Sequence, residues 1–117
     1  MTVTIYGIPN CDTMKKARAW LDGRGIAYEF HDYRANGLER DRLKGWVGKV
    51  GWETLLNKAS TTFRELSEKD RTAIDEARAI TLMLAQPTMI KRPVLDKDGA
   101  LTVGFKPEVY EAVFKRR

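Results

Sequence analysis

The chain runs Ile5-Tyr6-Gly7-Ile8-Pro9-Asn10-Cys11-Asp12-Thr13 near its start, and this stretch decides the fold. It places the one cysteine where a predicted strand ends and a predicted helix begins. A helix N-terminus offers unpaired backbone N–H groups and the positive end of the helix dipole, which stabilise a thiolate. We therefore expect the pKa of Cys11 to lie below the free value of about 8.5. The alternative is a structural cysteine that packs as a small apolar side chain.

The periodicity on both sides of this stretch predicts a β-α-β unit. Residues 2–6 alternate polar and apolar side chains, which is typical of a strand. Helical spacing of apolar residues follows from Asp12 until Gly23 and Gly25 stop the helix. Residues 27–33 predict a second strand, followed by a turn at Asn36-Gly37. We expect the two strands to be parallel, with a right-handed crossover.

Residues 38–86 predict a helical insert. An amphipathic helix spans residues 43–50 and closes at Gly51, and residues 52–56 suggest a short helical turn. Residues 67–70 resemble a capping box that opens a further helix, which Gln86-Pro87 ends. The apolar side of that helix is predicted to carry Ile74, Ala77, Thr81 and Leu84.

Strands return after the insert. Residues 93–96 and 100–104 predict a hairpin around Lys97-Asp98-Gly99, because Asp-Gly favours the positive φ of such turns. Lys106-Pro107-Glu108 then opens a last helix. The buried side of that helix is predicted to carry Val109, Tyr110, Val113 and Phe114.

The element order is therefore β-α-β, helical insert, β-β-α, the skeleton of an α/β thioredoxin-like fold. We expect a four-stranded mixed sheet with flanking helices and the insert between strands 2 and 3. All 117 residues form a single domain in this prediction, with a core at about 1–37 and 87–117 and the insert at about 38–86.

Composition limits the classes of function. One cysteine and one histidine, His31, exclude a His/Cys zinc site and an intramolecular disulfide. No run approaches the roughly 18 apolar residues of a membrane span, and the start lacks the pattern of a signal peptide. We expect a bacterial, cytoplasmic, monomeric protein in reducing conditions, with no bound cofactor or metal. His31 and the tryptophans Trp20, Trp46 and Trp52 are interpreted as packing residues.

The net charge of +5 does not indicate nucleic-acid binding, because acidic and basic residues alternate along the chain. Three positive charges, Lys115, Arg116 and Arg117, are expected at the end of the last helix. As a partner, an anionic small molecule or peptide fits the positive charge about as well as a nucleic acid does.

Several neighbours of Cys11 bear on its chemistry. Asn10, Lys15 and Lys16 would favour the thiolate, whereas Asp12 would raise the thiol pKa. Met14 occupies the second position of a Cys-x-x-Cys motif, so a mixed disulfide at Cys11 must be resolved by glutathione or a protein thiol.

The pair Arg92-Pro93 precedes the third strand, where a proline in this fold is usually cis and its loop faces the cysteine. We expect it to expose backbone groups that pair with a thiol peptide such as glutathione. Arg92 would place a guanidinium near the thiolate and the substrate carboxylate. The alternative is an edge-strand proline flanked by solvated cations, including Lys91.

These motifs resemble the arsenate-reductase-like ArsC/Spx family, closest to its YffB branch. The matching stretches cover the chain in order: Gly7-Ile8-Pro9-Asn10-Cys11-Asp12-Thr13, Lys15-Lys16-Ala17, His31-Asp32-Tyr33-Arg34, Gly51-Trp52-Glu53, Leu55-Leu56-Asn57 and Ile90-Lys91-Arg92-Pro93. The resemblance implies a thioredoxin fold, a redox thiol at Cys11 with Arg92 beside it, and a glutathione-dependent thiol reductase. Substrate-binding positions would be Asn10, Asp12, Thr13, Lys15, Asn57, Lys91, Pro93 and Lys106.

Two departures from the family pattern are informative. Arsenate reductases of this family present three arginines around the cysteine, and this chain has Asn57 and Lys106 in place of two of them. Because these changes weaken planar oxyanion recognition, efficient arsenate reduction is not expected. Met14 likewise removes the Cys-x-x-Cys switch that is typical of Spx regulators.

Three hypotheses follow. The leading one is a single-cysteine, glutathione-dependent thiol reductase. The second is an arsenate reductase with glutathione and a glutaredoxin-type donor. The third is a non-enzymatic, partner-binding regulator that uses the helical insert as its surface.

Overall fold

The computed structural model describes residues 1–115 and forms two compact units. Among the described residues, the sheet unit consists of residues 1–32 and 92–115, and the helical unit is Tyr33–Lys91. The prediction for the charges of Arg116 and Arg117 lies outside the described residues. Within residues 1–115, no helix combines the length and the apolar character that a membrane crossing requires.

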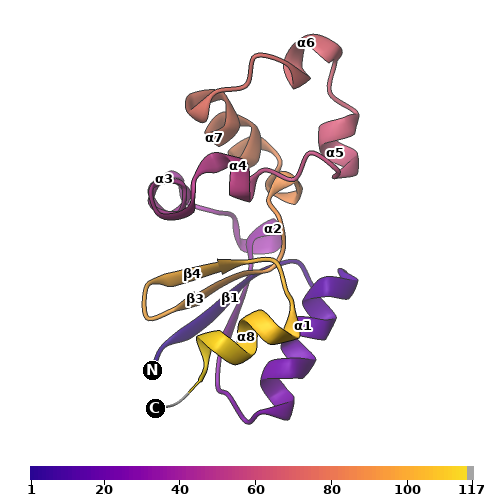
Figure 1. Ribbon diagram of the computed structural model, residues 1–117. Helices are drawn as coiled ribbons and strands as arrows, with labels where there is room; N and C mark the ends of the chain where they lie inside the picture. Colours follow the sequence, from indigo (N-terminus) through magenta and orange to yellow (C-terminus); the bar gives the residue numbers. More distant parts are fainter. Residues whose placement is uncertain (116–117) are drawn as a thin grey trace. The chain divides into compact units, whose positions relative to one another are not determined.

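The sheet unit holds one four-stranded mixed sheet in the order β2-β1-β3-β4 (Figure 1). Its strands are β1 (Val3–Gly7), β2 (Glu29–Asp32), β3 (Val94–Lys97) and β4 (Ala100–Val103). Strand β1 is parallel to β2 and antiparallel to β3, and β3 is antiparallel to β4. The predicted mixed sheet is confirmed.

One apolar core lies on one face of this sheet. Alternate residues of β1 point to the same face, and helices α1 (Asp12–Gly23) and α8 (Pro107–Val113) pack there. The buried residues of this cluster are Val3, Ile5, Met14, Ala17, Leu21, Leu95 and Tyr110. Val109 was predicted to be buried but is 39% exposed, whereas Tyr110 beside it is fully buried.

The hairpin turn forms where it was predicted. Lys97 pairs with Ala100, and the two residues between them, Asp98 and Gly99, have φ of 53° and 91°. The predicted second strand is wrong at both ends, since β2 covers only Glu29–Asp32. Tyr33 instead begins a helical turn and is 1% exposed. The strand was predicted too long because aromatic residues continue past Asp32, where the pairing of β2 with β1 ends.

The helical unit is a succession of short helices. They are α2 (Tyr33–Asn36), α3 (Arg40–Val50), α4 (Trp52–Leu55), α5 (Thr61–Arg64), α6 (Glu68–Arg71), α7 (Glu76–Ala85) and the 3₁₀ turn η1 (Pro87–Met89). Helix α3 ends at Gly51, whose φ is 85°, as predicted. Turns α5 and η1 were not predicted.

The predicted capping box opens only one helical turn. The Ser67 hydroxyl accepts a hydrogen bond from the Asp70 N–H at 3.2 Å, but α6 ends at Arg71. Asp75 then opens α7 by accepting from the Arg78 N–H at 2.8 Å. One long helix from residue 67 was therefore wrong, because Asp75 is a second, stronger N-cap.

The predicted apolar side of α7 was also wrong. Its buried residues are Ala79, Ile80, Leu82 and Met83. Ala77 and Thr81 are exposed, and the Thr81 hydroxyl donates to the Ala77 carbonyl at 3.0 Å. The large side chains of this helix remove more apolar area from water than Ala77 and Thr81 could, so they determine which face is buried.

Candidate functional site

Cys11 occupies the N-cap position of α1, between β1 and the first helical turn. Its backbone is extended (φ −124°, ψ 126°), and its carbonyl accepts the Lys15 N–H at 3.0 Å. The side chain is half-buried against the core cluster. The neutral side chain makes no cap hydrogen bond, but its place at the positive end of α1 favours a thiolate there.

Two opposing effects set the pKa of the Cys11 thiol. Burial raises it, and this is the largest single effect. The Met14 N–H, the Arg92 guanidinium and the Thr13 N–H all stabilise the thiolate, and together they outweigh burial. The pKa of Cys11 is therefore lowered from its ordinary value, in the direction predicted from the sequence.

The groups that cause this shift are only partly those predicted. The shift has no contribution from Asn10, Asp12, Lys15 or Lys16. Asn10, Asp12 and both lysines are exposed, so water weakens their influence on the sulfur. The contributions of the Met14 and Thr13 N–H groups are of the kind predicted, since the sequence placed unpaired N–H groups of a helix N-terminus beside Cys11.

Sheet pairing explains how Arg92 reaches Cys11. Tyr6, near the end of β1, pairs with Val94 at the start of β3. The residues that follow β1 and those that precede β3 therefore meet at the same edge of the sheet. The Arg92–Pro93 peptide bond is cis, as predicted. The Pro93 carbonyl accepts the Gly104 N–H at 2.8 Å, which fixes this loop against the end of β4.

Three other predicted positions have local roles. Lys106 is the N-cap of α8, where its side chain is exposed and its carbonyl accepts from the Val109 and Tyr110 N–H groups. In the helical unit, the Asn57 side-chain oxygen accepts the Ala59 N–H at 3.0 Å. Lys91 is exposed and its N–H donates to the Leu55 carbonyl at 2.8 Å. Substrate binding by Asn57, Lys91 and Lys106 stays a prediction.

Met14, which stands where a Cys-x-x-Cys motif would have its second cysteine, is a core residue. It is fully buried, and a Cβ added to Gly7 would lie 2.3 Å from its sulfur. Gly7 is therefore needed for space at the end of β1.

The aromatic and metal-ligating residues add no second chemical centre. His31 stacks on Tyr6 with ring centroids 5.2 Å apart, consistent with a packing residue. Within residues 1–115, no group of three His, Cys, Asp or Glu side chains is arranged to hold a metal ion.

Comparison with known proteins agrees with this architecture. A solved structure named YFFB is 58% identical, with a TM-score of 0.91 over 95% of this chain and 97% of that one. An arsenate reductase (ArsC) related protein from Brucella melitensis is 60% identical, with a TM-score of 0.80 over 99% and 97%. The global transcriptional regulator Spx of Streptococcus mutans is 26% identical over 97% of this chain and 84% of its own length. The model of the ArsC family matches residues 6–113, and the chain belongs to this family.

Proposed function

We propose that this protein is a single-cysteine, glutathione-dependent thiol reductase that acts through a mixed disulfide at Cys11. The observation that carries the proposal is the stabilisation of the Cys11 thiolate by Arg92 together with the N–H groups of Thr13 and Met14. A lowered pKa raises the thiolate fraction near neutral pH, and the thiolate is the attacking species.

The proposed cycle has two exchange steps. The Cys11 thiolate attacks a disulfide R–S–S–R′, which forms Cys11–S–S–R and releases R′–S⁻. The glutathione thiolate then attacks the mixed disulfide, which releases the Cys11 thiolate and forms R–S–S–glutathione. The released thiolate takes a proton from water. Glutathione supplies the second thiol because Cys11 is the only cysteine of the chain.

The Arg92 guanidinium has two functions in this proposal. It stabilises the thiolate as attacking and leaving group, and it offers donors to a carboxylate of glutathione. In the sheet unit, Asn10, Asp12, Thr13, Lys15, Pro93 and Lys106 would line the peptide. Lys91 and Asn57, in the helical unit, are proposed as further substrate-binding positions. A reducing cytoplasm and a monomeric state belong to the same proposal.

A coupled turnover assay tests the activity. The substrate is a peptide–glutathione mixed disulfide, with glutathione as reductant, and the initial rate is measured with parent protein and variants. We expect Cys11→Ser to abolish turnover and Arg92→Lys to slow it by about tenfold, because a bidentate contact is lost. Arg40→Lys, at an exposed position of α3, is the matched control and should leave the rate unchanged. Equal rates for the parent and Cys11→Ser would contradict the proposal.

Arsenate reduction is the second candidate, favoured by the likeness to an arsenate reductase related protein. Lys106 is an ammonium without a planar fork, and the Asn57 amide is neutral and engaged with Ala59. We expect negligible arsenate turnover by the parent with glutathione and glutaredoxin, and a measurable rise in Asn57→Arg/Lys106→Arg. Robust arsenate turnover by the parent would place this activity first.

A regulatory, non-enzymatic role is the third candidate, favoured by the similarity to Spx. Among residues 1–115, the large apolar side chains exposed to solvent are Met1 and Val109, both outside the helical unit. Docking through that unit would therefore rely on polar contacts. A purified partner that bound the parent and Cys11→Ser equally, without any turnover, would favour this role.

A further inference from the structure

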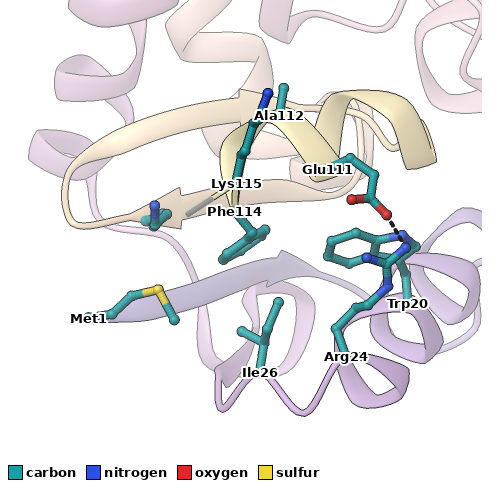
Figure 2. Close-up of a pocket in the computed structure, with 9 residues that line it drawn as sticks. Met1, Trp20, Arg24, Ile26, Glu111, Ala112, Phe114 and Lys115 are labelled. Atoms are coloured by element: carbon teal, nitrogen blue, oxygen red, sulfur yellow. Dashed lines mark ion pairs between the residues drawn. The ribbon is translucent and has the colours of Figure 1, made fainter. Parts of the chain in front are cut away.

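A cavity of about 850 Å³ lies in the sheet unit, at the far end of α1 from Cys11 (Figure 2). Arg24, the C-cap of α1, lines the cavity, whereas Cys11 is the N-cap. Helix α1 has 12 residues, which separates its two ends by about 18 Å. The volume is in the range of small-molecule sites, about 300–1,000 Å³. The proposed thiol exchange does not use this cavity.

Apolar and aromatic side chains form most of its walls. Trp20, Ile26 and Phe114 line it, and Met1 lies on its open side. The Trp20 and Phe114 rings are 5.8 Å apart between centroids and tilted by 37°. Half-buried aromatic faces of this kind offer a surface on which a flat apolar group can stack.

Cations surround these apolar walls. Lys97 Nζ donates to the Val113 carbonyl at 3.0 Å and lies 5.5 Å from the centre of the Phe114 ring. An ammonium has three donors, so Lys97 can bind an anion without losing this contact. Lys115, which is exposed, is a second cation of the lining.

Among residues 1–115, the one carboxylate side chain that lines the cavity is paired with a cation. Glu111 forms an ion pair with Arg24. The Arg24 guanidinium also stacks over the Trp20 ring, 4.6 Å from its centre. Since Arg24 and Glu111 cancel, Lys97 and Lys115 leave the cavity with a net positive charge.

We propose that this cavity binds a small aromatic carboxylate. Its ring would lie against Trp20 and Phe114, and its carboxylate would accept hydrogen bonds from Lys97. Apolar contact provides much of the binding free energy, and the ammonium selects an anion over a neutral molecule of the same shape.

The test is an NMR titration of the full-length protein with 1-naphthoate, with 1-naphthylmethanol as the neutral analogue. We expect saturable binding of the carboxylate with a dissociation constant at or below about 1 mM, the affinity class of a ligand of this size. The Trp20 indole N–H should shift, while those of Trp46 and Trp52, which do not line the cavity, serve as internal references. The neutral analogue should bind about tenfold more weakly.

Two charge variants should change the affinity in opposite directions. Lys97→Gln should weaken naphthoate binding by about tenfold. Glu111→Gln should strengthen it about threefold, because it removes the carboxylate that lines the cavity among residues 1–115. Glu111→Gln keeps the test decisive if Lys97→Gln disturbs the end of α8. Lys44→Gln, at an exposed lysine of α3, and Cys11→Ser should both leave the affinity unchanged.

Three results would overturn the proposal: no saturable binding, equal affinity for the acid and the alcohol, or binding that is lost in Arg92→Gln. The last would place the anion beside Arg92 at the thiol instead of in this cavity.

Discussion

The two units differ in their helix N-termini: side chains cap three helices of the helical unit, though not α3, whose N-cap is Glu39, and cap neither helix of the sheet unit among the described residues. In the helical unit, the side chains of Ser60, Ser67 and Asp75 each accept a backbone N–H bond from the helix that they open. In the sheet unit, the corresponding positions are Cys11 and Lys106, and neither side chain makes such a bond among the described residues.

A capped N-terminus stabilises its helix, whereas an uncapped one leaves its backbone N–H groups available for chemistry. An N-cap oxygen occupies donors that a helix would otherwise leave open. At α1 those donors, from Thr13 and Met14, stabilise the Cys11 thiolate instead. In the sheet unit, α1 therefore begins without a side-chain cap at the residue that carries the thiol.

The largest expected effect contrasts one glycine from each unit. Gly7→Ala should cost about 1–3 kcal/mol, because its Cβ would lie 2.3 Å from the sulfur of the fully buried Met14. Gly48→Ala, inside α3 with no atom within 4 Å, should gain up to about 1 kcal/mol from helix propensity. Chemical denaturation measures both. In a Met14→Ala background the cost of Gly7→Ala should shrink, and changes of the same sign in both variants would contradict this account.

The caps of the helical unit should differ among themselves. Asp75→Ala should cost about 1 kcal/mol, because α7 carries four buried residues. Ser67→Ala should cost less, since α6 is a single turn that buries none. Unfolding free energies compare the two variants. An equal or larger loss of stability in Ser67→Ala would favour the single long helix predicted from the capping box over two separate helices.

Cys11→Ser should separate stability from activity. Serine at the N-cap can accept the N–H groups that now meet the thiol, which should gain about 0.5 kcal/mol in acid while thiol exchange is lost. Because the pKa of Cys11 is lowered on folding, the thiolate's stabilisation is fully present above its unfolded pKa of about 8.5. It is lost as pH falls through the folded pKa. The serine variant's advantage should therefore shrink as pH rises. Denaturation across pH measures it, and an advantage that stays constant or grows with pH would show that the pKa is not lowered on folding.

The smallest effect is expected in the core of the sheet unit. The Tyr110 hydroxyl is buried and has no hydrogen-bond partner within residues 1–115. Tyr110→Phe should therefore change the unfolding free energy by less than about 0.5 kcal/mol at neutral pH, or raise it slightly. Tyr28→Phe, which loses the 3.3 Å bond between Arg18 Nε and the Tyr28 hydroxyl, should cost about 0.5–1.5 kcal/mol.

Alkaline pH should distinguish the parent from Tyr110→Phe. Burial raises the pKa of Tyr110 above its ordinary value, so its contribution to stability is fully present below the unfolded pKa of about 10 and is lost as pH rises above it. The parent should lose stability there that the phenylalanine variant keeps. If the stability of the parent and of Tyr110→Phe changed with pH in the same way, the pKa of Tyr110 would not be raised by burial.

Much of the sheet unit could be predicted because its signals are local. The alternation before Gly7, the helix that begins after Cys11 and the turn at Asp98-Gly99 each depend on a few consecutive residues, and each is present. In the helical unit, the same reasoning found α3 but placed α6 and α7 in one helix. The cap signals at Ser67 and Asp75 are close together in sequence. Local sequence does not show which of them begins the helix that buries apolar side chains.

Local sequence signals were enough to place the thiol, because strand periodicity, helix capping and turn preference act over neighbouring residues. The groups that surround the thiol depend on contacts between distant parts of the chain. Arg92 meets Cys11 because β1 pairs with β3 from the other end of the chain, and no local pattern encodes that pairing. The cavity beside Trp20 likewise exists only once α1, β3 and α8 have folded on one sheet, since its walls come from residues far apart in sequence.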